Sequence, residues 1–408
     1  MRSWFAMLAL AFTTAFTRAC ASTPSPDAVV RRLPPPGAAI VIVEPDVKLA
    51  LLAVNARKTA KPDWSATARD HIALHARTKV AGRKRQALAL SRSGASAKAR
   101  QVLLLHDALR ASVRTAETGD PAPAAMRHDR EWRLGVGARS LAAGGAAPQA
   151  LIITCDGDFT SALRAVFVVG AAAAGVLAPT GLTRASASPL DLDSGDIVLK
   201  NSIVASPEAR RRWLAHCRTA PSVIARRTFL FTAFAAAAGA SMRDPAPGVY
   251  RVGDDSIVQI DHVWSDFTRS GARKLRLLSQ NGPTLDRLYL VGGLKPGEGL
   301  TNRPRGAGVV KSDSTAEDLH AFIVVSVDAL GFTTSVLSNH RPAPLAAADG
   351  WRVDIATATS DGLALSGAEP YAQKADRLSA ILCLVKTEQY FADGWHLVEA
   401  IMASATLD

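Results

Sequence analysis

Two histidines four residues apart, His71 and His75, are the first pair whose types and spacing fit a metal ion. On a helix this spacing places both imidazoles on one face. The zinc motif of metalloproteases also needs a glutamate directly after the first histidine, and this chain has Ile72 there. No third ligand lies nearby in the sequence. An ordinary helix face is therefore the favoured interpretation, and we predict no metal site.

Aspartates form two further candidate groups. The run 191–196 has the composition of a calcium loop, but its glycine takes the fifth position and no glutamate closes a twelve-residue loop. A hairpin turn is the favoured interpretation of that run. Asp156 and Asp158 directly follow the apolar run 150–154, and in an α/β sheet the carboxyl ends of strands are where ligands bind. These two residues are our candidate ligand site.

No catalytic residue can be assigned from the sequence. The glycine pairs at 135–137 and 144–145 lack the strand–glycine–helix context of a dinucleotide loop, and neither a phosphate loop nor a G-x-S-x-G elbow occurs. The patterns therefore predict a non-enzymatic protein without a cofactor. Four aromatic residues of the C-terminal part are candidates for an apolar groove, with core packing as the alternative: Trp351, Tyr371, Tyr390 and Phe391.

The bulk composition indicates a folded chain of more than one domain. A length of 408 residues predicts two or three domains, and 48% hydrophobic with 21% charged residues is typical of globular proteins. No apolar run is long enough for a secure membrane span.

The whole chain has a net charge of +12, and the positive charge is concentrated in its first half. The segment 77–114 is strongly basic and contains the triplet Arg83, Lys84 and Arg85. This basic surface could attract an anionic partner, and a solvated helix face or loop is the alternative. Residues 65–131 contain no aromatic residue for base stacking, and no groove-reading motif is present, so nucleic acid is a disfavoured partner.

An export-signal pattern occurs twice. Residues 1–21 and 226–242 both run from arginine through an apolar stretch to small residues. Because a signal belongs at an amino terminus, the second copy predicts two exported modules joined end to end. A linker helix or a core helix is the alternative for that segment.

Cys20 is the candidate lipid-attachment residue at the end of the first leader. Ala19 before it fits a lipoprotein signal, whereas Arg18 does not, and Ala19 with Ala21 forms an alternative cleavage pattern. Lipidation would anchor the chain to a membrane, and both lipidation and plain secretion place it outside the cytoplasm. An uncleaved or defective leader is the third alternative.

The other cysteines show no metal-binding or redox spacing. Cys155 and Cys383 lie in apolar runs and are expected to be buried, while Cys155 with Cys217 is a candidate disulfide pair in an oxidising compartment.

The order of the expected elements predicts two modules. The first is a three-layer α/β domain with strands over 39–43 and 47–54, separated by a break at 44–46, and over 150–154. Its expected helices begin near 62, with Asp63 or Ser65 as the cap, and cover 97–114, 132–141, 163–176 and 206–217, with a hairpin turn at 193–196. The second is an α+β domain whose antiparallel sheet carries two helices, over 315–330 and 394–404, and Asp313 or Ser314 is the expected cap of the first. The predicted boundaries are a leader (1–21), a Pro/Ser tether (22–38), the α/β domain (39–222), the internal signal-like segment (223–242) and the α+β domain (243–408).

Two stretches of sequence resemble known families. Residues 30–220 resemble a group of uncharacterised proteobacterial lipoproteins, through the phrases at 40–47 and 190–198. Their layout also looks like the α/β domain of curli-secretion-type lipoproteins, by analogy of fold. Residues 243–408 are similar to a second uncharacterised proteobacterial family of exported proteins, through the phrases at 285–294 and 349–353. Neither resemblance brings a catalytic residue with it.

Together these patterns predict a non-enzymatic protein of the periplasm or outer membrane. Its expected role is an accessory or assembly module that binds an envelope protein or the cell-wall polymer. A hydrolase of envelope polymers is one alternative, and binding of an anionic surface or nucleic acid through segment 77–114 is another.

Overall fold

A computed structural model of the chain contains two compact units. Residues 1–100 and 132–232 form the first unit, and residues 101–131 and 233–408 form the second. The residues that the structure describes are 37–53, 55, 57–117, 133–142, 147–160, 183–197, 201–205, 247–253, 256–268, 274–300, 308–312, 314–345, 348–386 and 390–407.

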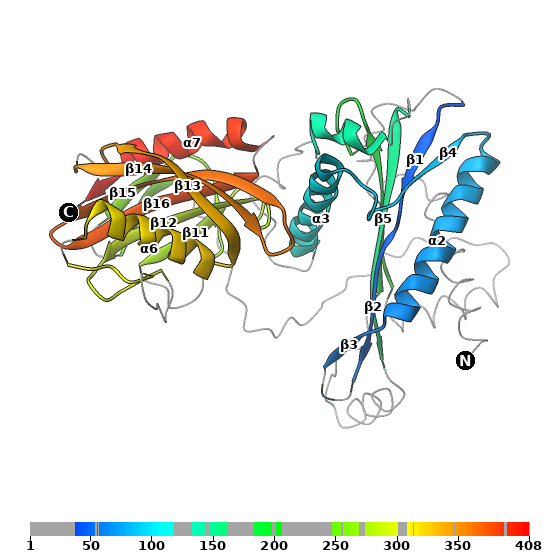
Figure 1. The fold of residues 1–408 in the computed structure, drawn as a ribbon, viewed down its shortest axis with the longest axis horizontal. Coiled ribbons are helices and arrows are strands. Elements are labelled where there is room, and N and C mark those ends of the chain that lie inside the picture. Colours follow the sequence, from blue (N-terminus) through cyan, green and yellow to red (C-terminus); the bar gives the residue numbers. More distant parts are fainter. Residues whose placement is uncertain are drawn as a thin grey trace. The chain divides into compact units, whose positions relative to one another are not determined.

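The first unit is built on a seven-stranded sheet centred on β5 (Gln149–Thr160) (Figure 1). β5 pairs in parallel with β1 and β2 along one edge and antiparallel with β6 along the other. β4 extends the sheet beyond β1, β3 extends it beyond β2, and β7 extends it beyond β6. These strands span β1 Ile40–Val43, β2 Asp46–Leu52, β3 Lys58–Ala60, β4 Ala87–Leu90, β6 Thr183–Asp191 and β7 Asn201–Ala205.

The edge formed by β1 and β2 contains a β-bulge, one residue more than the stretch of β5 with which it pairs. Ile40 pairs with Gln149, whereas Asp46 pairs with Thr154, so this edge contains one residue more than the matching part of β5. The extra residue falls at 44–45, where a proline without an N–H group interrupts the ladder. The sequence predicted both the break and the continuation of the strand after it.

Helix α2 (Pro62–Gly82) packs on one face of this sheet. Ile72, Ala76 and Val80 recur at helical spacing on its buried side. They share a core with alternate residues of the strands, because successive side chains of a strand point to opposite faces. The strand residues of this core are Ile42, Val47, Leu49, Ile153 and Cys155.

The start of α2 differs from the sequence prediction in one respect. Asp63 and Ser65 were the expected capping residues, but the N-cap is Lys61, which makes no side-chain capping bond, and Pro62 fills the first turn. The Ser65 hydroxyl instead donates to the Lys61 carbonyl and accepts from the amide of Leu49 on β2. This hydroxyl therefore fixes the helix to the sheet rather than capping the helix.

Two further helical segments agree with the predicted positions. α3 (Ala97–Glu117) covers the predicted helix at 97–114, and Val102, Leu105 and Leu109 at helical spacing are buried. The short helix predicted at 132–141 is a 3-10 helix, η2 (Val136–Ala142).

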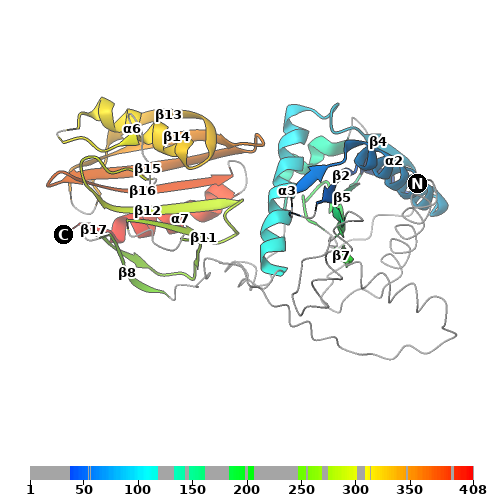
Figure 2. The same ribbon diagram turned by 90° about the horizontal axis from the view of Figure 1, so that it is seen from below.

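The second unit contains a seven-stranded antiparallel sheet in the order β10-β11-β12-β16-β15-β14-β13, and a separate three-stranded sheet in the order β17-β9-β8 (Figure 2). The strands span β8 Gly248–Val252, β9 Ser256–Ile260, β10 Ser265–Asp266, β11 Leu275–Ser279, β12 Asp286–Leu294, β13 Phe332–Pro342, β14 Gly350–Thr359, β15 Ala364–Lys374, β16 Arg377–Lys386 and β17 Thr406–Leu407.

Both faces of the larger sheet are packed. Helix α6 (Ala316–Ala329) covers one face, and helix α7 (Tyr390–Ser404) with the small sheet covers the other (Figures 1 and 2). Strand β16 supplies both cores by alternation: Leu382 and Leu384 face α6, and Cys383 faces α7. Burial on both sides explains why β16 reads as an unbroken apolar run.

Strand β15 was not predicted from the sequence, although it lies in the middle of the sheet. It contains Pro370, which cannot donate to a ladder and which usually argues against a central strand. The pairing of β15 with β16 continues on either side of Glu369 and Pro370 and omits these two residues. Gly367 is required here, because a Cβ atom at that position would lie 1.8 Å from the carbonyl oxygen of Cys383.

Helix α6 confirms the predicted helix at 315–330 and its buried face of Leu319, Phe322, Ile323 and Val327. The predicted capping residue was wrong. Thr315 caps the helix, and it forms a capping box with Asp318 in which each side chain bonds the other residue's amide. Ser314, one of the expected caps, donates its hydroxyl to the Lys311 carbonyl instead.

The N-terminal part of the chain is therefore α/β, and the C-terminal part is α+β with antiparallel sheets, as predicted. Residues 101–117 of α3, which we expected in the α/β domain, belong to the second unit together with α6 and α7. Within the described residues, no helix is long and apolar enough to cross a membrane. Several predicted features lie outside the described residues: the leader with Cys20, the tether, the helices at 163–176 and 206–217, and the segment 223–242.

Candidate functional site

The candidate ligand residues Asp156 and Asp158 lie within β5 and not beyond its end. The expected strand stopped at Thr154, but β5 continues to Thr160 because β2 and β6 pair with its polar half. The two carboxylates consequently project from the middle of the sheet. They lie on the face opposite the α2 core, to which the alternate residue Cys155 belongs.

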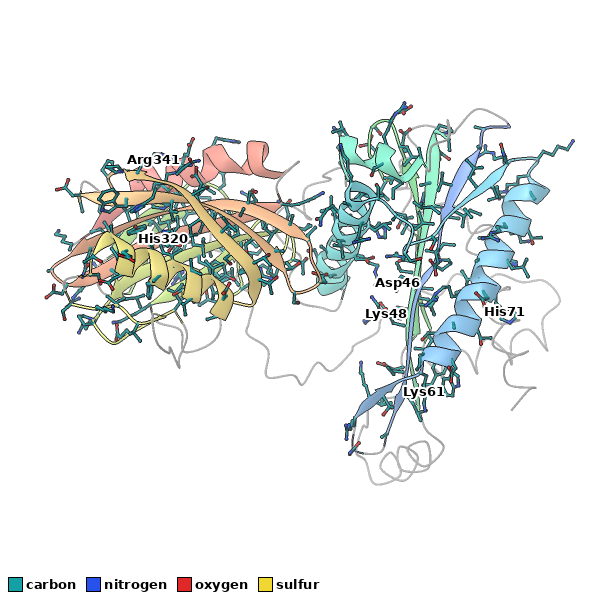
Figure 3. The ribbon with its side chains drawn as sticks, viewed as in Figure 1. Asp46, Lys48, Lys61, His71, His320 and Arg341 are labelled. Atoms are coloured by element: carbon teal, nitrogen blue, oxygen red, sulfur yellow. The ribbon has the colours of Figure 1, made fainter. Side chains whose placement is uncertain are left out.

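Charged residues of both signs share this face, which we call the charged face: Asp46, Lys48, Lys58, Asp156 and Asp158. Lys48 Nζ lies 2.8 Å from Asp46 and Lys58 Nζ lies 2.7 Å from Asp158. The lysine side chains are 67% and 63% exposed. Figure 3 shows Asp46 and Lys48 on the side of the sheet away from α2. Exposed pairs of this kind contribute little to stability, about 0–1 kcal/mol.

A second polar group lies where β1 and β4 end. The Glu44 carboxylate accepts hydrogen bonds from the Ser91 hydroxyl and the Arg92 amide, and the Arg92 side chain donates to the Glu44 carbonyl. Arg69 of α2 lies 3.6 Å from the same carboxylate. Glu44 thus holds the loop after β4 against the bulge, which is a structural role.

The aspartate run at 191–196 forms the predicted hairpin turn between β6 and β7. The Asp191 carboxylate accepts from the amides of Asp193 and Ser194, and Gly195 adopts φ +73. Arg139 pairs with Asp193, and Arg133 lies 2.8 Å from Asp196. These carboxylates are therefore occupied by the turn and its neighbouring arginines.

The two histidines of α2 do not share a site with a third ligand. His71 is exposed on the outer side of the helix (Figure 3), and His75 is half-buried with a pKa lowered by burial and by Lys79. No group of three or more histidine, cysteine or acidic residues with metal-binding geometry occurs among the described residues.

The basic triplet lies at the carboxyl end of α2. Lys84 has φ +56, and its amide bonds the Ala81 carbonyl while the Arg85 amide bonds the Val80 carbonyl. This pattern is a Schellman motif with lysine at the position usually taken by glycine. Arg83 and Lys84 are exposed, and positive charge here is favoured by the helix dipole. Part of this basic surface thus has a local structural explanation.

Two of the four candidate groove aromatics lie side by side. Trp351 on β14 is the cross-strand neighbour of Tyr371 on β15. Tyr371 is 1% exposed, whereas Trp351 is 37% exposed at the edge of the α6 face. The side chains of Tyr390 and Phe391 lie outside the described residues.

A histidine that the sequence did not single out completes this aromatic group. The His340 ring on β13 stacks on Trp351 with 4.7 Å between ring centroids and an interplanar angle of 28°. Its Nε2 atom lies 2.7 Å from the Tyr371 hydroxyl. We call His340, Trp351 and Tyr371 the aromatic shelf. No local pattern marks His340, because strand pairing alone brings it to the tryptophan.

Glu369 lies beneath the shelf, two residues before Tyr371 on the same strand and therefore on the same face. It is 2% exposed, and burial raises the pKa of its carboxyl to about 8. Burial, together with the nearby Glu369, also raises the pKa of the Tyr371 hydroxyl to about 12. At neutral pH the carboxyl is therefore largely protonated, and the tyrosine is a neutral hydroxyl.

Cys155 and Cys383 are buried free thiols, as their apolar runs predicted. Burial raises the pKa of the Cys383 thiol, which makes it unreactive in the folded unit. Cys217, the candidate disulfide partner of Cys155, lies outside the described residues.

Comparison with known proteins gives only weak structural likeness. No protein-family model and no curated protein matches the chain. Among solved structures, cyanobacterial PsbP (CyanoP) from Synechocystis sp. PCC 6803 is similar over 40% of this chain and 95% of its own, with 13% identity and a TM-score of 0.30. A likeness at this level carries no argument about function, so the family resemblances of the two halves stay predictions.

Proposed function

We propose that the chain is a non-enzymatic protein of the bacterial cell envelope, an accessory or assembly module whose first unit binds a partner protein. The export-signal pattern at 1–21 supports the location. The charged face supports the binding role, because it presents exposed lysines between carboxylates on a sheet whose opposite face is packed by α2.

The mixed charge of this face indicates the kind of partner. Lys48 and Lys58 alternate with three carboxylates, so the face has no uniform sign that would attract a polyanion. Another protein with complementary charges can satisfy both signs at once, and such complementarity favours specificity and fast association. The observation that carries the proposal is this alternation on an exposed strand face.

Site-specific photo-crosslinking in the native bacterium tests the proposal. A photoreactive residue at position 48 should yield a crosslinked species of defined mass, identified by mass spectrometry. A matched probe at Leu74, which is 64% exposed on α2, should not yield that species. Replacing Lys58 with Glu should remove the crosslink from position 48.

Two outcomes would refute the proposed function. One is a probe at position 48 that gives only the species formed from position 74. The other is turnover of peptidoglycan or lipid by the purified chain at high protein concentration, which would make the chain an enzyme.

A further inference from the structure

We propose that the second unit binds a sugar ring of a neutral glycan on the aromatic shelf, with the ring seated against Trp351 and a hydroxyl bonded to His340. This inference goes beyond the proposed function, because it gives the second unit a ligand and a site of its own. It rests on the exposure, hydrogen bonding and construction of the shelf.

Trp351 has the exposure that such a ligand needs. Six large hydrophobic side chains of the described residues are exposed, and Trp351 is the single aromatic one among them. A sugar ring has one face lined by C–H groups, which packs well on an aromatic surface, and hydroxyls that need polar partners around it. A tryptophan combines a large apolar surface with low conformational entropy, so burying it under a ligand is favourable.

His340 supplies the polar partner. Its Nε2 atom is held by the hydroxyl of Tyr371, which is itself buried. This bond fixes the orientation of the imidazole ring and leaves Nδ1 as the ring atom available to a ligand hydroxyl. The stacking on Trp351 holds the ring from a second direction.

A β-bulge in β13 places His340 on this face. Ser338 pairs with Asp354, and Arg341 pairs with Arg352, so β13 contains one extra residue between these pairs. Asn339 takes it up with φ +50. If the strand alternated regularly after Ser338, Asn339 would face α6 and His340 would point to the opposite side of the sheet.

Hydrogen bonds on the opposite face hold the bulge. The Asn339 side-chain amide donates to the Asp354 carboxylate at 2.9 Å, and Arg341 donates to both the Asn339 carbonyl and Asp354. Figure 3 shows Arg341 on β13. Asparagine adopts positive φ more readily than most residues, and these contacts hold it there and so keep His340 in place.

The surroundings favour a neutral glycan over a peptide or an anion. β13 is the outer strand of the sheet, but its bulges at Thr334 and Asn339 and its end at Pro342 interrupt the ladder that an added peptide strand would need. Arg341 and Arg352 share the Asp354 carboxylate on the opposite face of the sheet, so neither arginine belongs to the shelf.

Calorimetric titration of the full chain tests the inference. The ligands are the tetramers of N-acetylglucosamine and of glucose, with a proline-rich peptide as the competing class. We expect at least one tetramer to bind, Trp351→Ala to weaken its affinity by about tenfold or more, and Trp351→Phe to weaken it less. Val336→Ala is the matched control, because Val336 is 61% exposed on β13, the strand that carries His340, and its substitution should leave the affinity unchanged.

Substitution at the bulge tests the mechanism separately. Asn339→Gly retains the positive φ and should retain binding, whereas Asn339→Ile disfavours it and should weaken binding, with circular dichroism confirming that both variants fold. The inference is overturned if neither tetramer binds at millimolar concentration, if the peptide binds and the sugars do not, or if folded Trp351→Ala binds like the wild type. The crosslink from position 48 is independent of all three results.

Discussion

At the residue scale, burial determines the chemistry of Glu369 more than any partner does. Desolvation by burial is the cause of the raised pKa of this carboxyl. In the unfolded chain the pKa is near the ordinary value of 4.5, and in the folded chain it is about 8. The folded state therefore binds this proton more tightly, so the stability that Glu369 contributes is fully present below pH 4.5 and is lost as the pH rises through 8.

Glu369→Gln should remove this pH dependence. We expect the free energy of unfolding of the wild-type second unit to decrease by a few kcal/mol between about pH 4.5 and 8, because one pKa unit corresponds to about 1.4 kcal/mol. The glutamine variant should show a much smaller decrease over that range. Urea denaturation at several pH values measures both, and equal slopes for the two proteins would contradict the assignment to Glu369.

At the element scale, the end of α2 shows how a local rule can be broken for another purpose. Gly82 would be a natural terminator, but the left-handed residue of the Schellman motif is Lys84, two positions later. A lysine there bears the backbone strain that a glycine would avoid. It also adds positive charge beside the last carbonyls of the helix.

Lys84→Gly should stabilise the first unit by about 1 kcal/mol, because glycine adopts positive φ without steric cost. Arg83→Gly is the matched control and should not stabilise, since Arg83 has an ordinary φ of -94. The urea midpoint of each variant measures the change. A decrease in stability for Lys84→Gly would show that the charge at this position outweighs the strain.

At the scale of the whole molecule, each unit has a core of its own, and a buried thiol reports on each. Cys155 lies in the core under α2, and Cys383 lies in the core under α7. With Cys20 and Cys217 replaced by serine, we expect the two thiols to become reactive to a labelling reagent at different urea concentrations. Cysteine-to-serine variants identify each signal, and a single shared transition would contradict independent unfolding of the units.

Local signals in the sequence were sufficient to predict an element where one residue type controls the backbone conformation. The hairpin at 193–196, the start of α2 at Pro62 and the amphipathic face of α6 were predicted because proline, glycine and helical spacing act over a few residues. The fold class followed from the order of these elements. The capping residues of α2 and α6 were not predicted correctly, because several polar residues compete at each start and packing decides among them.

The amino-acid sequence by itself determined that this chain folds into an α/β and an α+β part, that Cys155 and Cys383 are buried, and that Asp156 and Asp158 follow an apolar strand core. The tertiary structure alone decided that β5 runs on through those aspartates, that β15 with Pro370 lies inside a sheet, and that His340 meets Trp351 and Tyr371. The physical reason is the distance along the chain over which the deciding interactions act. Turns and helix faces depend on neighbours in the chain, whereas strand register and the burial of a side chain depend on partners tens of residues away.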